Sequence, residues 1–187
     1  MEPVLYVDDA RYARLSAFLH EARSGSGREP AIASGDVPRV IIQEARMLDD
    51  RRYDEWLALF ADACLYWVPS RFEPGDPRTE TSIYLDDRRR MGDRVAAIRT
   101  GHFHAQTPPS RTRRMLSNIE QWTADDGSLR ARANVVIWEH RKGVTRSHPG
   151  WQAYEIMRAG DGEPVIGTKV VCLLDCDAPQ GNYGFIL

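Results

Sequence analysis

The sequence predicts an α+β fold, in which a curved mixed or antiparallel sheet wraps around helices that come earlier in the chain. Apolar residues recur at helical spacing over about the first half of the chain, and from residue 113 onward apolar and polar residues alternate instead. Short turn sequences divide this second part into runs of strand length. Helices followed by several consecutive strands are typical of an antiparallel sheet packed on its concave face against a helical layer.

Each helix expected in the first half of the chain has apolar residues on one face. In chain order, these residues are Leu15, Phe18, Leu19 and Ala22; Ile41, Ala45 and Leu48; Trp56, Leu57 and Phe60; and Met91, Val95 and Ile98. Pro38 suits the first turn of the second helix. Asp86 and Asp87 are expected to open the last helix, because carboxylates favour the positive end of a helix dipole, and Gly101 is expected to cap its other end.

The strands expected from the alternation form a meander. They cover residues 113–122, 129–140, 151–158 and 164–175, and they are separated by the turn sequences Asp125-Asp126-Gly127, Lys142-Gly143 and Asp161-Gly162. An earlier strand is expected at residues 64–68, closed by Pro69, and a loop at residues 71–79. A flexible Ser-Gly link at residues 24–27 divides the chain, so residues 1–37 are predicted as an N-terminal extension and residues 38–187 as one domain.

Composition and charge predict an ordinary soluble domain. The 187 residues are 42% hydrophobic and 28% charged, and a chain of this length can bury a substantial core. A formal net charge of −2 gives no reason to expect binding to nucleic acid or to an anionic membrane. The sequence has no apolar run of membrane-spanning length and no signal-peptide pattern at its start. Because three cysteines cannot form a disulfide framework, we expect a cytoplasmic protein.

The cysteines and histidines lack the spacing of a complete metal site. Cys64, Cys172 and Cys176 are expected to be small buried residues, since no paired Cys and His motifs accompany them. His102 and His104 are two apart on an extended segment, so both could reach one ion. No local carboxylate completes that site, because Asp93 lies on the preceding helix. We therefore predict no metal ion and no cofactor in this chain, and expect surface or interface histidines.

A general acid/base site is the alternative chemistry. A histidine paired with an aspartate in a pocket of the curved sheet can transfer protons, and His102 or His104 with Asp86 or Asp87 would be that pair. A solvated aspartate pair explains the same residues without any chemistry. The sequence has no Gly-rich phosphate loop, no nucleophile elbow and no nucleotide-binding fingerprint. No catalytic residue is assigned on this basis.

The most distinctive segment is a double proline followed by a basic stretch, at residues 105–119. The prolines favour an extended chain, and the following strand is expected to place Met115 and Ile119 on one face, with Arg114, Leu116 and Asn118 on the other. Guanidinium groups on a rigid segment suit pairing with the carboxylates of a partner. The predicted interface residues are Pro109, Ser110, Arg111, Thr112 and Arg113.

Aromatic residues concentrate in the segments expected to form strands. They are Tyr66, Trp67, Trp122, Trp138, Trp151 and Tyr154. Core packing explains such residues, and an alternative is that some of them anchor a protein interface, where Trp, Tyr and Arg are enriched.

Taken in order, several segments resemble the small (β) subunit of aromatic-ring-hydroxylating dioxygenases. These segments are LDDRRYDEWL (48–57), YWVP (66–69), SIYLDD (82–87), DRV (93–95), RTG (99–101), PPSRTRRMLSN (108–118), KVV (169–171) and NYGFIL (182–187). The Pro-Pro-Ser-Arg-Thr-Arg core is specific, whereas the Asp-Asp and aromatic pieces alone are weak signals. The resemblance covers roughly residues 38–187.

The resemblance implies a cone-shaped fold of the nuclear-transport-factor-2-like type and an α3β3 hexamer. It implies that the partner α subunit carries a Rieske [2Fe-2S] cluster and a mononuclear iron, with electrons from NAD(P)H arriving through a separate reductase. The β subunit is then a non-catalytic member of a complex that dihydroxylates an aromatic ring, in contact with the α subunit and with other β subunits. No catalytic or metal-binding role is carried over to any residue here.

Two features depart from the pattern of that family. His102-Phe103-His104 stands where no pair of histidines is expected, and the N-terminal helix and link extend beyond the shared region. The alternatives are a free-standing dehydratase or isomerase of the same cone fold, using a His–Asp pair, and a ligand-binding module without chemistry.

Overall fold

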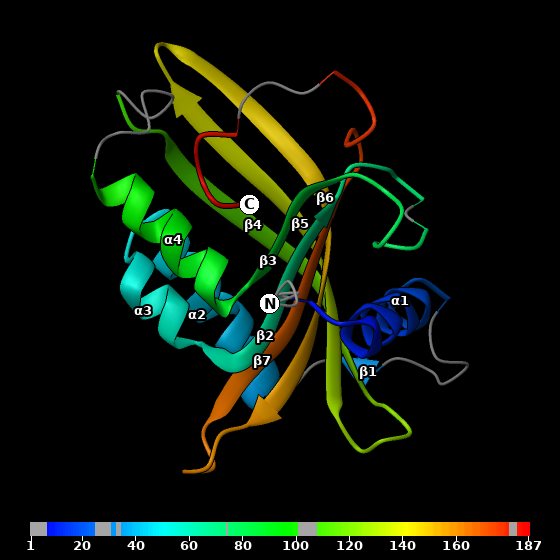
Figure 1. The fold of residues 1–187 in the computed structure, drawn as a ribbon. Coiled ribbons are helices and arrows are strands. Elements are labelled where there is room, and N and C mark those ends of the chain that lie inside the picture. The colour runs from blue at the N-terminus through cyan, green and yellow to red at the C-terminus, as the bar shows by residue number, and fades with distance from the viewer. Residues whose placement is uncertain (1–6, 25–30, 33–34, 74, 101–107, 180–182) are drawn as a thin grey trace, which may run out of the picture.

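The structure, a computed structural model, describes residues 7–24, 31–32, 35–73, 75–100, 108–179 and 183–187. Its helices are α1 (Asp9–Ser24), α2 (Asp36–Asp49), α3 (Tyr53–Ala58) and α4 (Arg88–Arg99). Its strands are β1 (Ala31–Ile32), β2 (Phe60–Pro69), β3 (Ser82–Asp87), β4 (Arg111–Thr123), β5 (Leu129–Arg141), β6 (Val144–Arg158) and β7 (Pro164–Leu173). The predicted α+β class is confirmed (Figure 1).

All strands belong to one seven-stranded sheet with the order β1-β4-β5-β6-β7-β2-β3. The segment from β4 to β7 is the predicted antiparallel meander, because each strand pairs with the next along the chain. β7 then pairs in parallel with β2, which makes the sheet mixed. The turns between the long strands use the left-handed backbone of Gly127, Gly143 and Gly162, whose φ angles are 80°, 78° and 87°.

The main core lies between the concave face of the sheet and helices α2, α3 and α4 (Figure 1). Alternate residues of each strand point into it, such as Tyr66 of β2 and Tyr154 of β6. The apolar faces predicted for the helices are confirmed, since Ile41, Leu48 and Met91 are buried there. The last residues of the chain, 185–187, are buried in the same core.

Helix α1 packs on the opposite face of the sheet. Its buried residues Leu15 and Phe18 join a second core with the other set of alternate strand residues, which includes Trp67 and Trp151. Polar contacts also hold α1: Glu21 accepts a hydrogen bond of 2.7 Å from the indole of Trp122 and pairs with Arg130. The helix therefore forms a third layer over part of the sheet, and the division of the chain at residue 37 stays a prediction.

Several predicted boundaries were wrong. Phe60 begins β2 instead of ending the third helix, and Asp86 and Asp87 end a strand that was not predicted, β3. Helix α4 begins at Arg88, and Asp87 caps it by accepting a hydrogen bond of 2.9 Å from the backbone N–H of Arg90. Gly101, the predicted C-terminal cap, lies outside the described residues.

Strand β6 begins at Val144, before the expected start at residue 151. The alternation gave no signal there because most of the side chains between Val144 and Gly150 are exposed, so neither face of this segment needs to be apolar.

The predicted alternation in β4 fails at Asn118. This residue has a φ of 50°, and the register with β5 shifts between Ser117 and Glu120. A bulge of this kind adds one residue to a strand and reverses the faces that follow it. Leu116 and Ile119 consequently both pack against the main core, whereas Met115 is 63% exposed. Met115 and Ile119 therefore do not share a face.

Candidate functional site

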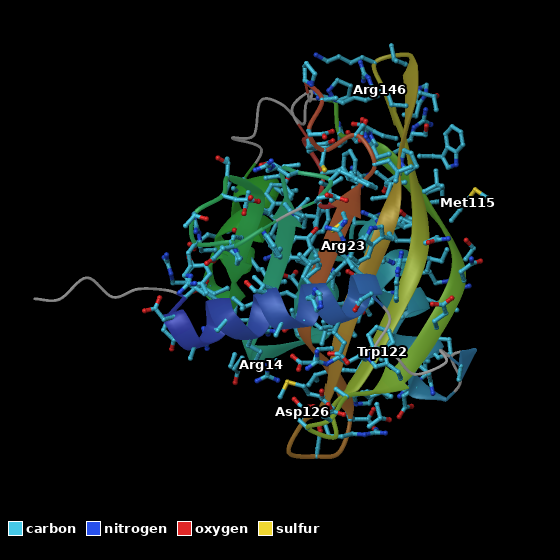
Figure 2. All side chains as sticks on the ribbon, turned by 90° about the vertical axis from the view of Figure 1, so that its right-hand side faces the viewer. Arg14, Arg23, Met115, Trp122, Asp126 and Arg146 are labelled. Atoms are coloured by element: carbon cyan, nitrogen blue, oxygen red, sulfur yellow. The ribbon has the colours of Figure 1, made fainter. Side chains whose placement is uncertain are left out.

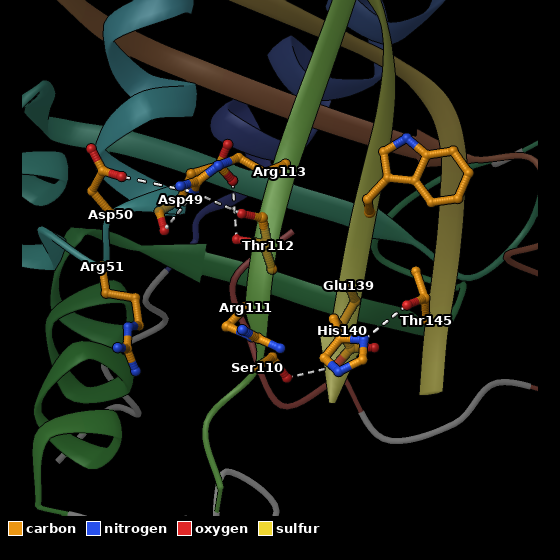
Figure 3. Close-up of a pocket in the computed structure, with 11 residues that line it drawn as sticks. Asp49, Asp50, Arg51, Ser110, Arg111, Thr112, Arg113, Glu139, His140 and Thr145 are labelled. Atoms are coloured by element: carbon orange, nitrogen blue, oxygen red, sulfur yellow. Dashed lines mark hydrogen bonds and ion pairs between the residues drawn. The ribbon is translucent and has the colours of Figure 1, made fainter. Parts of the chain in front are cut away.

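Four of the five predicted interface residues, Ser110 to Arg113, line one side of a surface groove of about 540 Å³ (Figure 3). The C-terminal end of α2, with Asp49, Asp50 and Arg51, forms one boundary, and Trp138, His140 and Thr145 of the β5–β6 hairpin form the other. Ser110 and Thr112 are buried, whereas Pro109, Arg111 and Arg113 are exposed. The stretch thus divides into side chains that face the protein and side chains that face solvent.

Asp49 fixes the basic stretch to helix α2. Its carboxylate accepts hydrogen bonds from the Thr112 hydroxyl at 3.0 Å, from the backbone N–H of Arg114 at 2.9 Å and from the Arg114 guanidinium at 2.6 Å. The Arg114 side chain is only 2% exposed, and it also donates to the backbone carbonyl of Ile186. Charge-assisted hydrogen bonds of this kind are strong when they are shielded from water. These contacts of Asp49 with Thr112 and Arg114, called the internal lock below, hold part of the stretch against helix α2.

Ser110 is held from the other side, by strand β5. Its hydroxyl donates to Glu139, whose second carboxylate oxygen lies 3.5 Å from Nε2 of His148. The His148 ring packs against the rings of Tyr183 and Phe185, with centroid distances of 5.3 and 5.6 Å. These successive contacts, from Ser110 through Glu139 and His148 to Tyr183 and Phe185, connect the start of β4 to the C-terminal segment of the chain.

The outward-facing arginines make fewer and longer contacts within the protein than Arg114 does. The Arg113 side chain is 72% exposed, donates 3.0 Å to the carbonyl of Thr112 and lies 3.8 Å from Asp50. Arg111 and Arg51 line the groove without an ion pair to any other described residue. Of the aromatic residues considered above, Tyr66, Trp67, Trp151 and Tyr154 are buried, whereas Trp138 is 44% exposed at the groove. Trp138 is thus the aromatic side chain available at this surface.

The most unusual chemistry lies inside the protein, on the concave face of the sheet. Nζ of Lys169 lies 2.6 Å from Oε1 of Glu44, and each side chain is 1% exposed. Glu44 also accepts 2.9 Å hydrogen bonds from the Trp56 indole and the Tyr154 hydroxyl. Lys169 is placed by register, since it lies between Tyr154 of β6 and Tyr66 of β2 in adjacent strands.

Burial and pairing set the charges of this cluster. Burial alone would raise the pKa of Glu44, but the ammonium of Lys169, with hydrogen bonds from Lys169 and Trp56, outweighs it and holds the pKa below its usual value. Burial lowers the pKa of Lys169, and Glu44 opposes that change. Burial also raises the pKa values of Tyr66 and Tyr154 well above 10. Because both oxygens of Glu44 are already bonded within the protein, this cluster supplies an internal ion pair and no exposed acid or base.

The proposed His–Asp pair is not assembled by the described residues. Asp86 is buried and accepts two hydrogen bonds from Arg94, at 2.9 and 2.7 Å, and Asp87 is the helix cap described above. His102 and His104 lie outside the described residues. The aspartates that the alternative required therefore have structural partners.

The cysteines are confirmed as free, buried thiols. Burial raises the pKa of Cys64 to about 11 and that of Cys172 to about 12, so neither is a thiolate at neutral pH. Within the described ranges, no three His, Cys, Asp or Glu side chains converge as metal ligands. The described donors therefore do not converge on the four ligands that an iron–sulfur cluster needs. None of the described helices is long and apolar enough to cross a membrane.

Sequence reasoning missed the internal roles of Glu44, Lys169, Asp49 and Arg114. A signal was present for the first two, because Glu44 falls on the apolar face of its helix and Lys169 interrupts an apolar strand. A charged residue at a core position is expected to have a partner. Nothing in the sequence identified which two residues would meet.

Three kinds of comparison agree on what this chain is similar to. The model of the family described as "Ring hydroxylating beta subunit" matches residues 43–178. The small oxygenase component of the p-cumate 2,3-dioxygenase system of Pseudomonas putida is 31% identical, over 83% of this chain and 88% of that protein. The β subunit of benzoate 1,2-dioxygenase from Acinetobacter baylyi is 33% identical, over 76% of this chain and 86% of that protein.

Solved structures show the same fold. The crystal structure of the β subunit of benzoate 1,2-dioxygenase from Burkholderia mallei superposes with a TM-score of 0.66 at 27% identity, covering 83% of this chain and 99% of that one. A chain of naphthalene 1,2-dioxygenase has a TM-score of 0.68 over 97% of this chain and 95% of its own length, and its 18% identity supports the fold alone. The family model spans well over half of the sequence. The chain therefore belongs to the ring-hydroxylating β-subunit family, the small subunits of aromatic-ring-hydroxylating dioxygenases.

Proposed function

We propose that this chain is the non-catalytic, structural subunit of an α3β3 aromatic-ring dioxygenase. The observation that carries the proposal is the Glu44–Lys169 pair. The concave side of the sheet is where a cone fold would hold a substrate, and here it is filled by charges that neutralise each other and by residues 185–187. A buried pair whose polar atoms are already bonded offers no group for proton transfer to a substrate. Assembly is the role that remains for the exposed surface.

The reaction centres of the complex then belong to the larger α subunit. In this proposal the α subunit holds the Rieske cluster and the mononuclear iron, and a separate reductase delivers electrons from NAD(P)H for the cis-dihydroxylation of an aromatic ring by dioxygen. The burial of the described free thiols supports that division of labour. The complex is proposed to work in the cytoplasm, without nucleic acid or membrane partners.

The proposed contact with the α subunit includes Pro109, Ser110, Arg111, Thr112 and Arg113. Ser110 and Thr112 contribute by fixing the backbone, because their hydroxyls are bonded to Glu139 and Asp49. Arg111 and Arg113 face outward and can pair with carboxylates of the partner. Backbone fixed in advance lowers the entropy lost when such a contact forms.

Co-expression tests the proposal. The chain expressed alone should show no oxygenase turnover and bind no stoichiometric iron, whereas co-expression with its Rieske-type large subunit should yield an α3β3 hexamer that is active when reductase is supplied. Native mass spectrometry gives the stoichiometry, and iron analysis of each subunit gives the metal distribution. A chain that stays monomeric or homodimeric, with no affinity for that large subunit, would contradict the proposal.

A further inference from the structure

The outer face of the sheet is only partly covered. Helix α1 crosses part of this face, and Figure 2 shows Met115 and Arg146 beyond the region that α1 covers. On the uncovered part, Met115 of β4 lies in register with Val136 of β5, and Arg113 lies in register with Trp138. Met115 and Trp138 are both large side chains left open to solvent. The register places these two side chains on the same face of adjacent strands, in neighbouring diagonal positions, where together they can offer apolar surface to a partner.

The rim of this surface carries an excess of positive charge. Arg51 and Arg111 line the groove beside Trp138 and have no ion pair with a described residue. Of the neighbouring acids, Asp49 is neutralised by its ion pair with Arg114, whereas Glu139 keeps its charge but is buried and accepts a hydrogen bond from Ser110. Of the three acidic residues that line the groove, Asp50 is the exposed one, and its carboxylate lies 3.8 Å from Arg113. The complementary surface must therefore be acidic.

The backbone that carries the exposed arginines and Trp138 is held in place by hydrogen bonds and strand pairing. The three hydrogen bonds from Asp49 hold the backbone that carries Arg111 and Arg113, and β5 holds Trp138 between two paired strands. Tryptophan and arginine are the residue types that most often dominate binding energy at protein interfaces. A fixed aromatic side chain flanked by guanidinium groups can receive an apolar side chain and carboxylates together.

We propose that Arg51, Arg111, Arg113, Met115 and Trp138 form one docking surface for an acidic segment of the large oxygenase subunit. In this arrangement an apolar side chain of that segment packs on Trp138 and Met115, and its carboxylates pair with Arg51 and Arg111. The inference rests on the proposed function and adds the anchor residues and the chemistry of the partner. A second copy related by a twofold axis would bring the same arginines against each other, which disfavours that occupant of the surface.

The test uses the purified complex and follows its dissociation on dilution by mass photometry. Trp138→Ala should raise the apparent Kd on the order of 30-fold, as expected for an aromatic residue at the centre of an interface. Arg111→Glu should raise it at least about tenfold, because a like charge then faces the partner's carboxylates. Added salt should weaken the wild-type complex and have less effect on Arg111→Glu.

Matched variants away from the groove serve as controls. Ile42→Ala removes an apolar residue of α2 with similar exposure, and Arg89→Glu reverses an exposed charge on α4, so both should leave the Kd within about twofold of wild type, as for surface substitutions outside an interface. The melting temperature of each isolated variant reports on folding. If Trp138→Ala lowers that temperature, Arg111→Glu decides alone, because Arg111 has no internal ion pair to lose.

Each result has one interpretation. A wild-type complex that Trp138→Ala and Arg111→Glu weaken, with unchanged melting temperatures, supports the docking surface. A complex that resists both substitutions overturns this inference and leaves the proposed function intact. A wild-type chain that does not bind the large subunit at all overturns the proposed function.

Discussion

The ammonium of Lys169 and the carboxylate of Glu44 form an ion pair of 2.6 Å between strand β7 and helix α2, in the centre of the main core. The pair joins residues 125 positions apart in the chain, so it forms only when the sheet and the helix are correctly docked. Both charges have lost their hydration. The stability of the protein therefore depends on each partner being present.

Breaking this pair should destabilise the protein strongly. Glu44→Gln keeps the shape of the side chain and leaves the Lys169 ammonium buried without a counter-charge, so we expect the free energy of unfolding to fall by about 3–5 kcal/mol. The double variant Glu44→Gln with Lys169→Met removes both charges and should be more stable than the single variant. Urea denaturation measures both. A loss below about 1 kcal/mol for Glu44→Gln would show that water reaches the pair.

The same pair predicts a dependence on acid. The pKa of Glu44 in the folded protein lies below the ordinary value of 4.5 that it has in the unfolded chain, because Lys169 and Trp56 stabilise the carboxylate. Its contribution is therefore complete above pH 4.5 and is lost as the pH falls through the lower, folded pKa, because the unfolded state then binds more protons. Denaturation at a series of pH values should give a steeper loss below pH 4.5 for the wild type than for Glu44→Gln. Equal slopes would exclude this carboxylate as the cause.

Adjacent aspartates at the end of α2 should differ widely in importance. Asp49→Ala leaves the buried Arg114 without its counter-charge and removes three hydrogen bonds, so a loss of about 3–5 kcal/mol in the free energy of unfolding is expected. Asp50→Ala removes only a 3.8 Å contact between exposed side chains and should change it by less than about 0.5 kcal/mol. Thermal or chemical denaturation compares the two, and similar losses would disprove the internal lock.

The thiols should be unreactive until the protein unfolds. Since burial raises the pKa of Cys64 to about 11 and that of Cys172 to about 12, almost no thiolate is present at pH 8. We expect a thiol-specific reagent to label the native chain far more slowly than the denatured chain, as followed by mass spectrometry. Rapid labelling of either residue in the native protein would show that the strands open readily.

Replacing both outward-facing arginines should affect assembly more than folding. Arg111→Ala with Arg113→Ala is expected to weaken association with the large subunit by about 2–5 kcal/mol, because carboxylates of the partner would be left without their charges. The melting temperature of the isolated chain should change little. An intact hexamer together with a much lower melting temperature would instead assign these arginines an internal role.

The sequence predicted the parts of the fold that rest on local patterns. The apolar faces with Leu15 and Phe18 and with Ile41 and Leu48 were evident because helices repeat every 3.6 residues, and the turns at Gly127, Gly143 and Gly162 separated the long strands. Asn118 illustrates what local patterns miss. A residue with left-handed backbone within a strand reverses the faces of the residues that follow it. The sequence around Asn118 contains no pattern that predicts this conformation.

Pairings over long distances were also beyond the sequence. Asp49 was noted only within the segment at residues 48–57 and Arg114 only as part of the basic stretch, and their contact spans 65 positions. The predicted interface therefore included Ser110 and Thr112, whose hydroxyls face inward, and did not include Trp138. Trp138 differs from Ser110 and Thr112 in being exposed to solvent. The exposure of each side chain is known only once the sheet is assembled.

The hydrogen bond from the Arg114 backbone to Asp49 also limits how other chains can approach. That N–H points away from β5, as does the Thr112 carbonyl that the Arg113 guanidinium covers. β1 pairs with β4 only at Glu120 and Gln121, so among the described strands the remaining length of this border has no neighbour. Side chains occupy the positions that an added strand would need, which protects the border against edge-to-edge aggregation. A partner that approaches Thr112 and Arg114 therefore meets side chains in place of free backbone groups.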